Sequence, residues 1–516
     1  MKKLGILFAG ISEKGVKILI LLILAVLTVW VGQDTYLYPE DYSNEILIWR
    51  EDNLFRQLAW AAAAMLLTGV LSALLFRGKE ERWKEKFVKR FAVFEIILIG
   101  VLLVTWVAAT RFSQSRDAQQ VYYILRKFRA GDYSDMNSCY LQGFQQQLGL
   151  MFLEDLLLSL WPDIRIFQYL NVLFILGIIF FLYRISDLLF HNQTINLYCL
   201  AACAAFLPMH FYVNLAYGDI CSISLSLMAV WALMRWSETR LKRYAAAAAA
   251  GMCISMLARK NTLIILIAMI ICLVIHAWKE WDWRPCVLAL LIAALSLGSP
   301  VLAALYYQAR SGVELGDSMP AVLWIAMGIH GEPGAYGVYN GYHESVFWGT
   351  GGNAQEASAI ARTHIRERLE EFAANPPLAY DFYKNKILQQ WGENTYGSMI
   401  LTLDRQRCEG ELVQNVYFGS VRNFLLAYMN HYTFLLYFGT LLFAAQSLSR
   451  KDGIWCCLMP VIITGGFLFS MLWENKSRYV LPYVIAMIPY MCCGIWILQE
   501  KMVKILKILS PEHKRH

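Results

Sequence analysis

Charged residues are scarce in this chain of 516 residues. Asp, Glu, Lys and Arg make up 16% of it, against about 25% in an ordinary soluble domain. Hydrophobic residues make up 58%, and the mean hydropathy is +0.43. This composition argues against a soluble domain and predicts an integral membrane protein. The formal net charge of +7 does not indicate nucleic-acid binding, because basic residues of membrane proteins gather in cytoplasmic loops.

Sequence motifs for metals and nucleotides are also missing. None of the 12 cysteines forms a CxxC or Cys/His pattern, and His330 and His343 lack the spacing of a metal-binding pair. There is no Gly-rich phosphate loop. We therefore expect no required metal and no cofactor. Most cysteines lie in apolar segments, where they behave as small hydrophobic side chains. Cys139 and Cys408 lie in long polar loops, and a disulfide between them stays open.

Long apolar segments are abundant instead. Roughly twenty apolar residues cross the hydrocarbon core of a bilayer. The N-terminal segment has no small-residue cleavage site, so we interpret it as an anchor rather than a removed signal peptide. A short apolar stretch at 148–161 contains Glu154 and Asp155, and we expect it to lie along the membrane interface. Twelve other segments qualify as spans: 16–33, 57–76, 92–110, 166–185, 193–213, 218–236, 243–258, 261–278, 285–306, 431–448, 454–473 and 478–498.

The distribution of basic residues predicts the orientation of these spans, because Lys and Arg favour cytoplasmic loops. Both termini are then cytoplasmic, and the segments 111–165 and 307–430 face outward. If 148–161 were a span, the basic loop 235–243 would face outward, against this rule. The basic segments that fall inside are 1–17, 77–90, 235–243, 279–284, 450–451 and the tail from 501.

We predict an all-α polytopic membrane protein with about 12 transmembrane helices. Amphipathic interface helices are expected in the first long outer loop, and a mixed, mainly helical outer loop domain in the second. In "ASAIARTHIRERLEEFAANPP", apolar residues recur near helix spacing before a stop at Asn375-Pro376-Pro377. The expected parts are an N-terminal two-helix membrane hairpin with a basic loop (1–90), a membrane core (91–306), the outer loop domain (307–430), C-terminal membrane helices (431–500) and a basic tail (501–516).

The stretch "SQSRDAQQV" (113–121) changes polarity directly after the apolar segment 92–110. Its acid, Asp117, follows Arg116. Between a span and an interface helix, Asp117 would be held at the membrane face, although an Asp at a helix start that faces water is the ordinary alternative. The nearby alternatives to Asp117 as the functional acid are Asp132 and Asp135, in "GDYSD", whose setting fits turn chemistry or a helix cap. After Asp117, apolar residues recur with amphipathic helix spacing suited to a membrane surface, at Val121, Ile124, Leu125 and Phe128.

Two pairs of basic residues stand out on the expected outer side. "LARKNTLI" contains Arg259 and Lys260, and "WENKSRYVLPY" contains Lys476 and Arg478, each in a tight turn between apolar runs. Charges this close to hydrocarbon are costly and usually functional. The pairs suit phosphate binding, and the alternative is snorkelling to lipid headgroups.

Four further residues are candidates for substrate contacts. Asp219, in "AYGDICS", either accepts a hydrogen bond from a sugar or acceptor hydroxyl or caps the following helix. Trp391, Glu393 and Tyr396, in "WGENTYG", combine aromatic faces with an acid, which suits sugar binding and equally suits the interior of a small packed domain.

The order of these features is similar to that of the GT-C class, membrane glycosyltransferases that use lipid-phosphate-linked sugars. One span, an outer loop that opens with an acid and two interface helices follow each other as in that class. The resemblance covers about 91–490 and is greatest to a Gram-positive bacterial branch, although "FQQQLG" lacks the Pro expected there. The stretches that carry it are "RDAQQV…GDYSD…YLQGFQQQLGL", "PMHFYVNLAYGDICSISL", "LARKNTLI", "MPAVLWIAMG", "YKNKILQQWGENTYGS" and "WENKSRYVLPY".

The resemblance implies a GT-C-like core in the bacterial plasma membrane, an active site on the outer face and Asp117 as the catalytic acid. It also implies undecaprenyl phosphate as the lipid of the donor. A sugar on a polyprenyl phosphate already has its leaving group, so the enzyme needs a base for the acceptor hydroxyl and cations for the phosphate. Arg116 would orient Asp117 or help to hold the donor.

The resulting hypothesis is an inverting glycosyltransferase with Asp117 as general base. Its partners are a polyprenyl-phosphate-linked sugar, membrane lipid and an acceptor that is a glycan, a lipid or a protein, with no nucleic acid. The alternative is a transporter or flippase of a lipid-linked sugar. A transporter needs a polar site near mid-membrane, whereas the ionisable residues here collect at one face, which favours the enzyme.

Overall fold

The computed structural model describes residues 2–449 and 453–509. It is about 79% helical. In the described part, its sheet is a single antiparallel pair of strands, β1 (Asp34–Leu37) and β2 (Ile48–Glu51). Nine described helices are long and apolar enough to cross a membrane. The helical content and these nine helices agree with the predicted class, an all-α polytopic membrane protein.

Most of the expected spans lie on these nine helices. A tenth span would be a bent pair, α8 (Gln193–Ala205) with α9 (Leu207–Phe211), which changes direction by 52°. The expected spans at 243–258 and 431–448 lie in α11 (Lys242–Ala258) and α20 (Ser420–Ser447), which are not among the nine, so twelve spans stay a prediction. The nine are α1 (Lys2–Gln33), α2 (Leu54–Phe76), α3 (Glu81–Thr110), α7 (Arg165–Phe190), α10 (Asp219–Thr239), α12 (Leu263–Glu280), α13 (Arg284–Ser311), α21 (Leu458–Leu472) and α22 (Leu481–Leu509).

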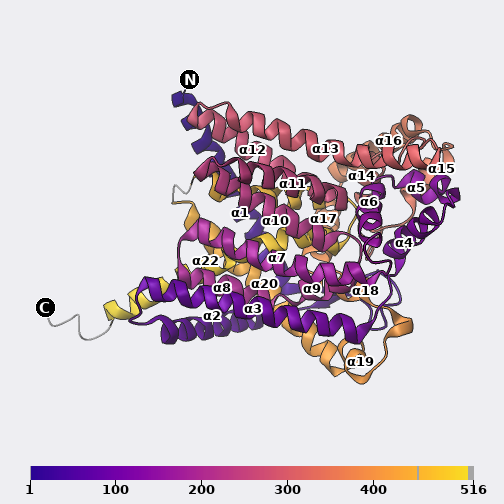
Figure 1. Ribbon diagram of the computed structural model, residues 1–516. Helices are drawn as coiled ribbons and strands as arrows, with labels where there is room; N and C mark the ends of the chain where they lie inside the picture. The colour runs from indigo at the N-terminus through magenta and orange to yellow at the C-terminus, as the bar shows by residue number, and fades with distance from the viewer. Residues whose placement is uncertain (1, 450–452, 510–516) are drawn as a thin grey trace.

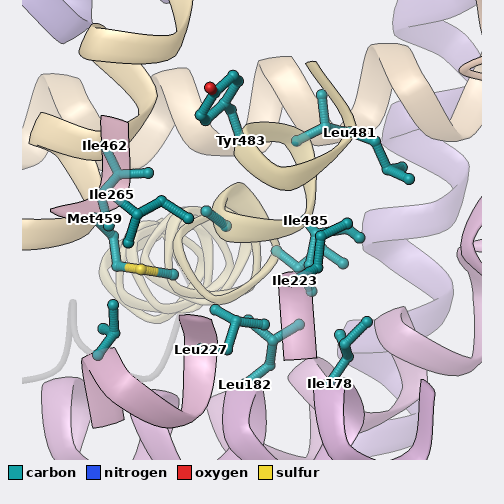
Figure 2. Packing of buried hydrophobic residues seen from close by; sticks show 14 of the residues in the cluster. Ile178, Leu182, Ile223, Leu227, Ile265, Met459, Ile462, Leu481, Tyr483 and Ile485 are labelled. Carbon is teal, nitrogen blue, oxygen red and sulfur yellow. The ribbon is translucent and has the colours of Figure 1, made fainter. Parts of the chain in front are cut away.

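The centre of the bundle is an apolar cluster where α7, α10, α12, α21 and α22 meet (Figure 2). Lipid tails are as apolar as these side chains, so in a bilayer the cluster stabilises the fold through van der Waals contact rather than by leaving water. The buried residues labelled in Figure 2 are Ile178, Leu182, Ile223, Leu227, Ile265, Met459, Ile462, Leu481, Tyr483 and Ile485.

The first helix belongs to the same bundle, because α1 packs against α12, α20 and α21. The start of α1 and the last turns of α22 lie at one end of the molecule, on the left in Figure 1. The opposite end gathers shorter helices: α4 (Arg116–Arg129), α5 (Cys139–Gly143), α6 (Gln147–Leu158), α14 (Val322–Gly328), α15 (Tyr342–Gly349) and α16 (Ala354–Ala374).

The first long loop differs from its expected role in one respect. The predicted amphipathic helix exists as α4, but its apolar stripe is buried in the protein. Phe128, for example, packs on the rings of Tyr133 and Tyr307. Amphipathic spacing shows only that one face of the helix needs an apolar environment. For α4, the rest of the protein provides this environment instead of lipid. The stretch at 148–161 forms the twelve-residue α6, which is not among the nine candidate spans.

The helix expected before Asn375 is confirmed. α16 ends at Ala374, and α17 (Pro376–Trp391) begins directly after Asn375. The Asn375 side chain accepts a hydrogen bond from the backbone N–H of Leu378 at 3.3 Å, which caps α17, and Pro376 occupies the first helical position, where no donor is lost.

Three other sequence-based expectations concern the loops and the tail. Cys139 is exposed and Cys408 is buried, and no disulfide joins them in the structure. The expected tail begins inside α22, which continues to Leu509, while residues 510–516 lie outside the described residues. The expected basic loop at 450–451 also lies outside them.

Candidate functional site

A cavity of about 910 Å³ lies at the end of the bundle where α4, α5, α14 and α15 gather. Its wall combines segments far apart in the sequence: the loop between β1 and β2, the start of α4, the residues before α10, the turn between α11 and α12, and the turn between α21 and α22. This wall brings together six residues that the sequence analysis selected: Arg116, Asp117, Arg259, Lys260, Lys476 and Arg478.

Asp117 lies in the first turn of α4 and is exposed. The helix macrodipole favours a carboxylate at this end. The segment before α4 is fixed by the buried side chain of Gln114, which donates to the carbonyl of Asn214 at 3.0 Å and accepts from the backbone N–H of Ala216 at 2.7 Å. Asp117 therefore has a defined place beside the residues that precede α10.

Tyr217 connects the acid to the cations. Its hydroxyl donates to Asp117 Oδ2 at 3.3 Å and accepts from Gln147 Nε2 at 2.6 Å. The guanidinium groups of Arg259 and Arg478 lie 4.6 and 5.1 Å from the centre of its ring, within cation–π range. Burial, helped by the charge of Asp117, raises the pKa of Tyr217, so its hydroxyl stays protonated as a donor. The sequence analysis missed Tyr217, although it stands two positions before Asp219 in a stretch already selected.

Asp219 serves the two arginines as a buried counter-ion. Its Oδ1 lies 3.4 Å from Arg259 and 4.0 Å from Arg478, and the residue is 9% exposed. It borders a separate small cavity of about 20 Å³ rather than the main one. Asp219 therefore lies behind the wall of the main cavity. Removal of Asp219 would leave the buried charges of the two arginines unpaired.

A glycine makes this arrangement possible. Gly218 has a φ of +80°, and a Cβ at this position would lie 2.7 Å from the carbonyl oxygen of Ala258. The start of α10 can therefore approach the end of α11, where Arg259 follows.

Lys476 and Arg116 meet an acid from the hairpin of β1 and β2. The carboxylate of Glu45 forms an ion pair with Arg116 and lies 3.5 Å from Lys476 Nζ, while Glu474 lies 3.4 Å from the same ammonium. Burial alone would lower the pKa of Lys476, but the combined effect of Glu474, Tyr479 and Asp117 raises it. Arg116 has a φ of +56°, a conformation that a non-glycine residue adopts only at a cost.

Trp391, Glu393 and Tyr396 do not line the cavity, and each is 0% exposed. The Glu393 carboxylate accepts bonds from the backbone N–H groups of Thr395 at 2.8 Å and Gly397 at 2.7 Å and from the hydroxyl of Ser477 at 2.9 Å. The structure thus favours the packing alternative over substrate contact. Aromatic and acidic composition could not separate the two, because a packed turn and a sugar site use the same residues.

The turn built by these residues still affects the site. Burial raises the pKa of Glu393, while its hydrogen bonds from Thr395, Gly397 and Ser477 act in the opposite direction. Because Ser477 directly follows Lys476, the bond from Ser477 to Glu393 fixes the backbone that carries the lysine.

A buried lysine of α17 connects two helix ends that border the cavity. Lys386 of α17 is 0% exposed, and its ammonium donates to the carbonyl oxygens of Met471 at 2.9 Å and Trp473 at 2.7 Å, and to that of Gly328. These carbonyls stand at the C-terminal ends of α21 and α14, where a cation is favoured. Lys386 therefore joins the two helices next to the cavity.

One end of the cavity is aromatic. The rings of Trp324 and Trp473 stack with centroids 5.8 Å apart, and His343 packs on Trp324 at 4.9 Å. Tyr339 packs on His343 and donates to Glu344 at 3.3 Å. The sequence analysis noted some of these residues but could not place them together.

Another side of the cavity is apolar. Leu263, Ile264 and Ile267 of α12 line it together with Phe469 of α21. Ile267 is 48% exposed, so this apolar wall continues onto the outside of the bundle. The cavity thus combines a cluster of cations, an aromatic end, an apolar flank and four acids, of which Asp117 lies beside the neutral Tyr217.

In the part of the chain that the structure describes, no group of three or more His, Cys, Asp or Glu side chains is placed to hold a metal ion. The expectation that the protein requires no metal stays a prediction. No family model, no curated protein and no solved structure matches the chain, so the site is known here by its own geometry.

Proposed function

We propose that this protein is an integral-membrane glycosyltransferase of the GT-C type, which moves a sugar from a polyprenyl-phosphate donor to an acceptor hydroxyl with inversion. One observation carries the proposal. The wall of a single cavity contains Asp117 together with both basic pairs, which come from separate segments of the chain: Arg259, Lys260, Lys476 and Arg478.

The proposed reaction needs a base and a stabilised leaving group. Asp117 takes the proton of the acceptor hydroxyl while that oxygen attacks the anomeric carbon. The bond from this carbon to the phosphate oxygen breaks, and polyprenyl phosphate leaves with the electron pair. The guanidinium and ammonium groups of the cavity stabilise the charge that develops on the phosphate. The neutral hydroxyl of Tyr217 holds Asp117 during this step.

The apolar flank suits the lipid of the donor. Leu263, Ile264 and Ile267 lead from the cavity to the side of α12, which lies against lipid in a bilayer. The phosphate can then reach the cations while its chain stays in the membrane.

The position of the cavity favours an enzyme over a transporter. Asp117, Arg259 and Lys476 all stand at helix ends, and a transporter needs its polar site near the middle of the membrane. The positive-inside pattern and the resemblance to bacterial glycosyltransferases assign this end to the outer face of the plasma membrane, with both termini in the cytoplasm.

The direct test is Asp117→Asn in membranes supplied with a polyprenyl-phosphate sugar. Transfer should fall by about 10²- to 10⁴-fold, because the base is lost while the shape of the side chain is kept. The matched control is Asp132→Asn, an exposed acid of the same loop that pairs with Lys127 outside the cavity. Transfer at the wild-type rate by Asp117→Asn would refute the assignment of the base.

A second measurement distinguishes the proposed enzyme from a transporter. Wild-type protein in proteoliposomes should move no labelled lipid-linked sugar across the bilayer beyond the empty-liposome rate. Rapid movement without transfer to an acceptor would support the flippase instead.

A further inference from the structure

The cations of the cavity have counter-ions of two kinds. Arg259 and Arg478 face Asp219, which is buried at the start of α10 and belongs to the packed bundle. Arg116 faces Glu45, which lies in the loop between β1 and β2, and Lys476 lies between Glu45 and Glu474. Asp219 is fixed by the bundle, whereas Glu45 is carried by a surface hairpin.

The base of this hairpin is firmly attached. Tyr36 donates to Asn385 at 2.8 Å, and the hydroxyl of Tyr38 lies 3.3 Å from that of Ser477. The guanidinium of Arg422 donates to the Tyr42 hydroxyl at 3.2 Å and to the Tyr38 carbonyl at 3.4 Å. Up to Tyr42, the hairpin is therefore part of the rigid wall.

The tip that follows, residues 43–47, is held differently, although Leu47 at its end packs against the apolar core. Its hydrogen bonds are local: Ser43 N–H donates to Asp41 at 3.0 Å, and Ile46 N–H donates to Asn44 at 2.9 Å. Ile46 is 53% exposed. The charged contacts of the tip with the cavity wall run through Glu45, whose side chain is 34% exposed.

We propose that the Glu45 carboxylate occupies the place of a phosphoryl oxygen between Arg116 and Lys476 when the site is empty, and that a bound phosphoryl group displaces it together with the tip 43–47. The carboxylate is an anion of the right charge and size to bridge the two cations. Its release costs two partly exposed ion pairs, which are weak enough for a ligand to replace. Glu45 thus lowers the affinity of the site for phosphate when no donor is bound, because it pairs with Arg116 and shares Lys476 with Glu474.

This inference rests on the proposed role of the cavity as a phosphate site, but its test measures binding rather than sugar transfer. A protein that failed the transfer test would still give a definite answer here.

The first experiment compares the binding of inorganic phosphate to purified wild-type protein and to Glu45→Gln by isothermal titration calorimetry in detergent. The dissociation constant should fall by roughly three- to tenfold in Glu45→Gln, because the competing charge is gone. Glu40→Gln is the matched control, an exposed acid of the same hairpin that pairs with Arg50 instead, and should bind as the wild type does. Unchanged or weaker binding by Glu45→Gln would overturn the proposal.

A second probe separates the phosphoryl group from the lipid. Geranyl phosphate, a short prenyl phosphate, should show the same improvement as inorganic phosphate. An improvement for geranyl phosphate alone would overturn the proposal, since the prenyl chain rather than the phosphate would then displace the tip.

Hydrogen–deuterium exchange of the peptide 38–51 tests the movement itself. Saturating phosphate should speed exchange in the wild type, and Glu45→Gln should show the faster exchange without any ligand. Slower exchange on binding would mean that the hairpin closes over the ligand, and it would refute the proposed displacement of the tip.

Discussion

At the residue scale, the cavity depends on how one neutral side chain is placed among charges. Tyr217 touches the acid through its hydroxyl and the two arginines through its ring. Loss of the ring and loss of the hydroxyl should therefore have different effects. The ring spaces the guanidinium groups, and the hydroxyl positions Asp117.

Tyr217→Phe keeps the ring and removes the hydroxyl. We expect kcat to fall by about 10- to 100-fold, because a misplaced base loses its near-attack geometry. The KM for the donor should change little, since the contacts of the ring with the arginines remain. Steady-state kinetics with a polyprenyl-phosphate sugar measure both values. Tyr339→Phe is the control, since it removes another hydroxyl of the cavity wall, which donates to Glu344. A rise in KM with unchanged kcat in Tyr217→Phe would contradict the positioning role.

At the scale of elements, α20 and α22 approach each other closely at a pair of glycines. A Cβ on Gly494 would lie 1.9 Å from the carbonyl oxygen of Gly439, a distance at which the two helices must separate. Small residues at such crossings let membrane helices pack closely, and van der Waals contact rather than the hydrophobic effect holds them together. The glycines thus let α20 and α22 pack closely, and α1 and α2 also contact α20.

Gly494→Ala should destabilise the protein by about 1–3 kcal/mol, the usual cost of overpacking a well-packed contact. Thermal unfolding in detergent, followed by loss of soluble monomer, measures this as a lower Tm. The matched control is Gly298→Ala in α13, where a Cβ would meet no atom within 4 Å. Its Tm should stay the same or rise, because alanine favours a helix over glycine. Equal Tm values for the two variants would mean that the crossing is not tight.

At the scale of the whole molecule, the bundle has two different ends. The start of α1 and the end of α22 lie at one end, and the short helices α4, α5, α14 and α15 lie at the other (Figure 1). Residues of these short helices line the cavity. The basic loop at 235–243 joins α10 to α11 at the ends of these helices away from Asp219 and Arg259. If the cavity faces outward, this loop must face the cytoplasm.

A membrane-impermeant thiol reagent tests that arrangement in intact cells. The native Cys139, which is exposed, should be labelled from outside. In a Cys139→Ser background, Glu238→Cys places a thiol in the basic loop, and it should react only after the membrane is permeabilised. Labelling of Glu238→Cys in intact cells would reverse the topology and place the cavity on the cytoplasmic side.

The sequence by itself determined the class of the protein and the residues with unusual local surroundings. Hydropathy shows where a helix can lie in lipid, and a charge next to an apolar run is conspicuous without any tertiary contact. For this reason Asp117 and the two basic pairs were selected as candidates, and the helical pattern that begins at Ala357 was predicted with its stop at Asn375. Tyr217 gave no such signal, since a tyrosine beside an apolar segment is common in membrane proteins.

Only the tertiary structure decided which of these residues share a cavity and which acid neutralises which cation. Asp219 meets Arg478, and Glu45 meets Lys476, although the two residues of each pair lie far apart in the sequence. Periodicity cannot report such pairs, because it describes each segment alone. The same reason explains why the sequence left two roles open for Glu393 and why the apolar stripe of α4 was assigned to lipid: burial depends on the neighbour that folding supplies.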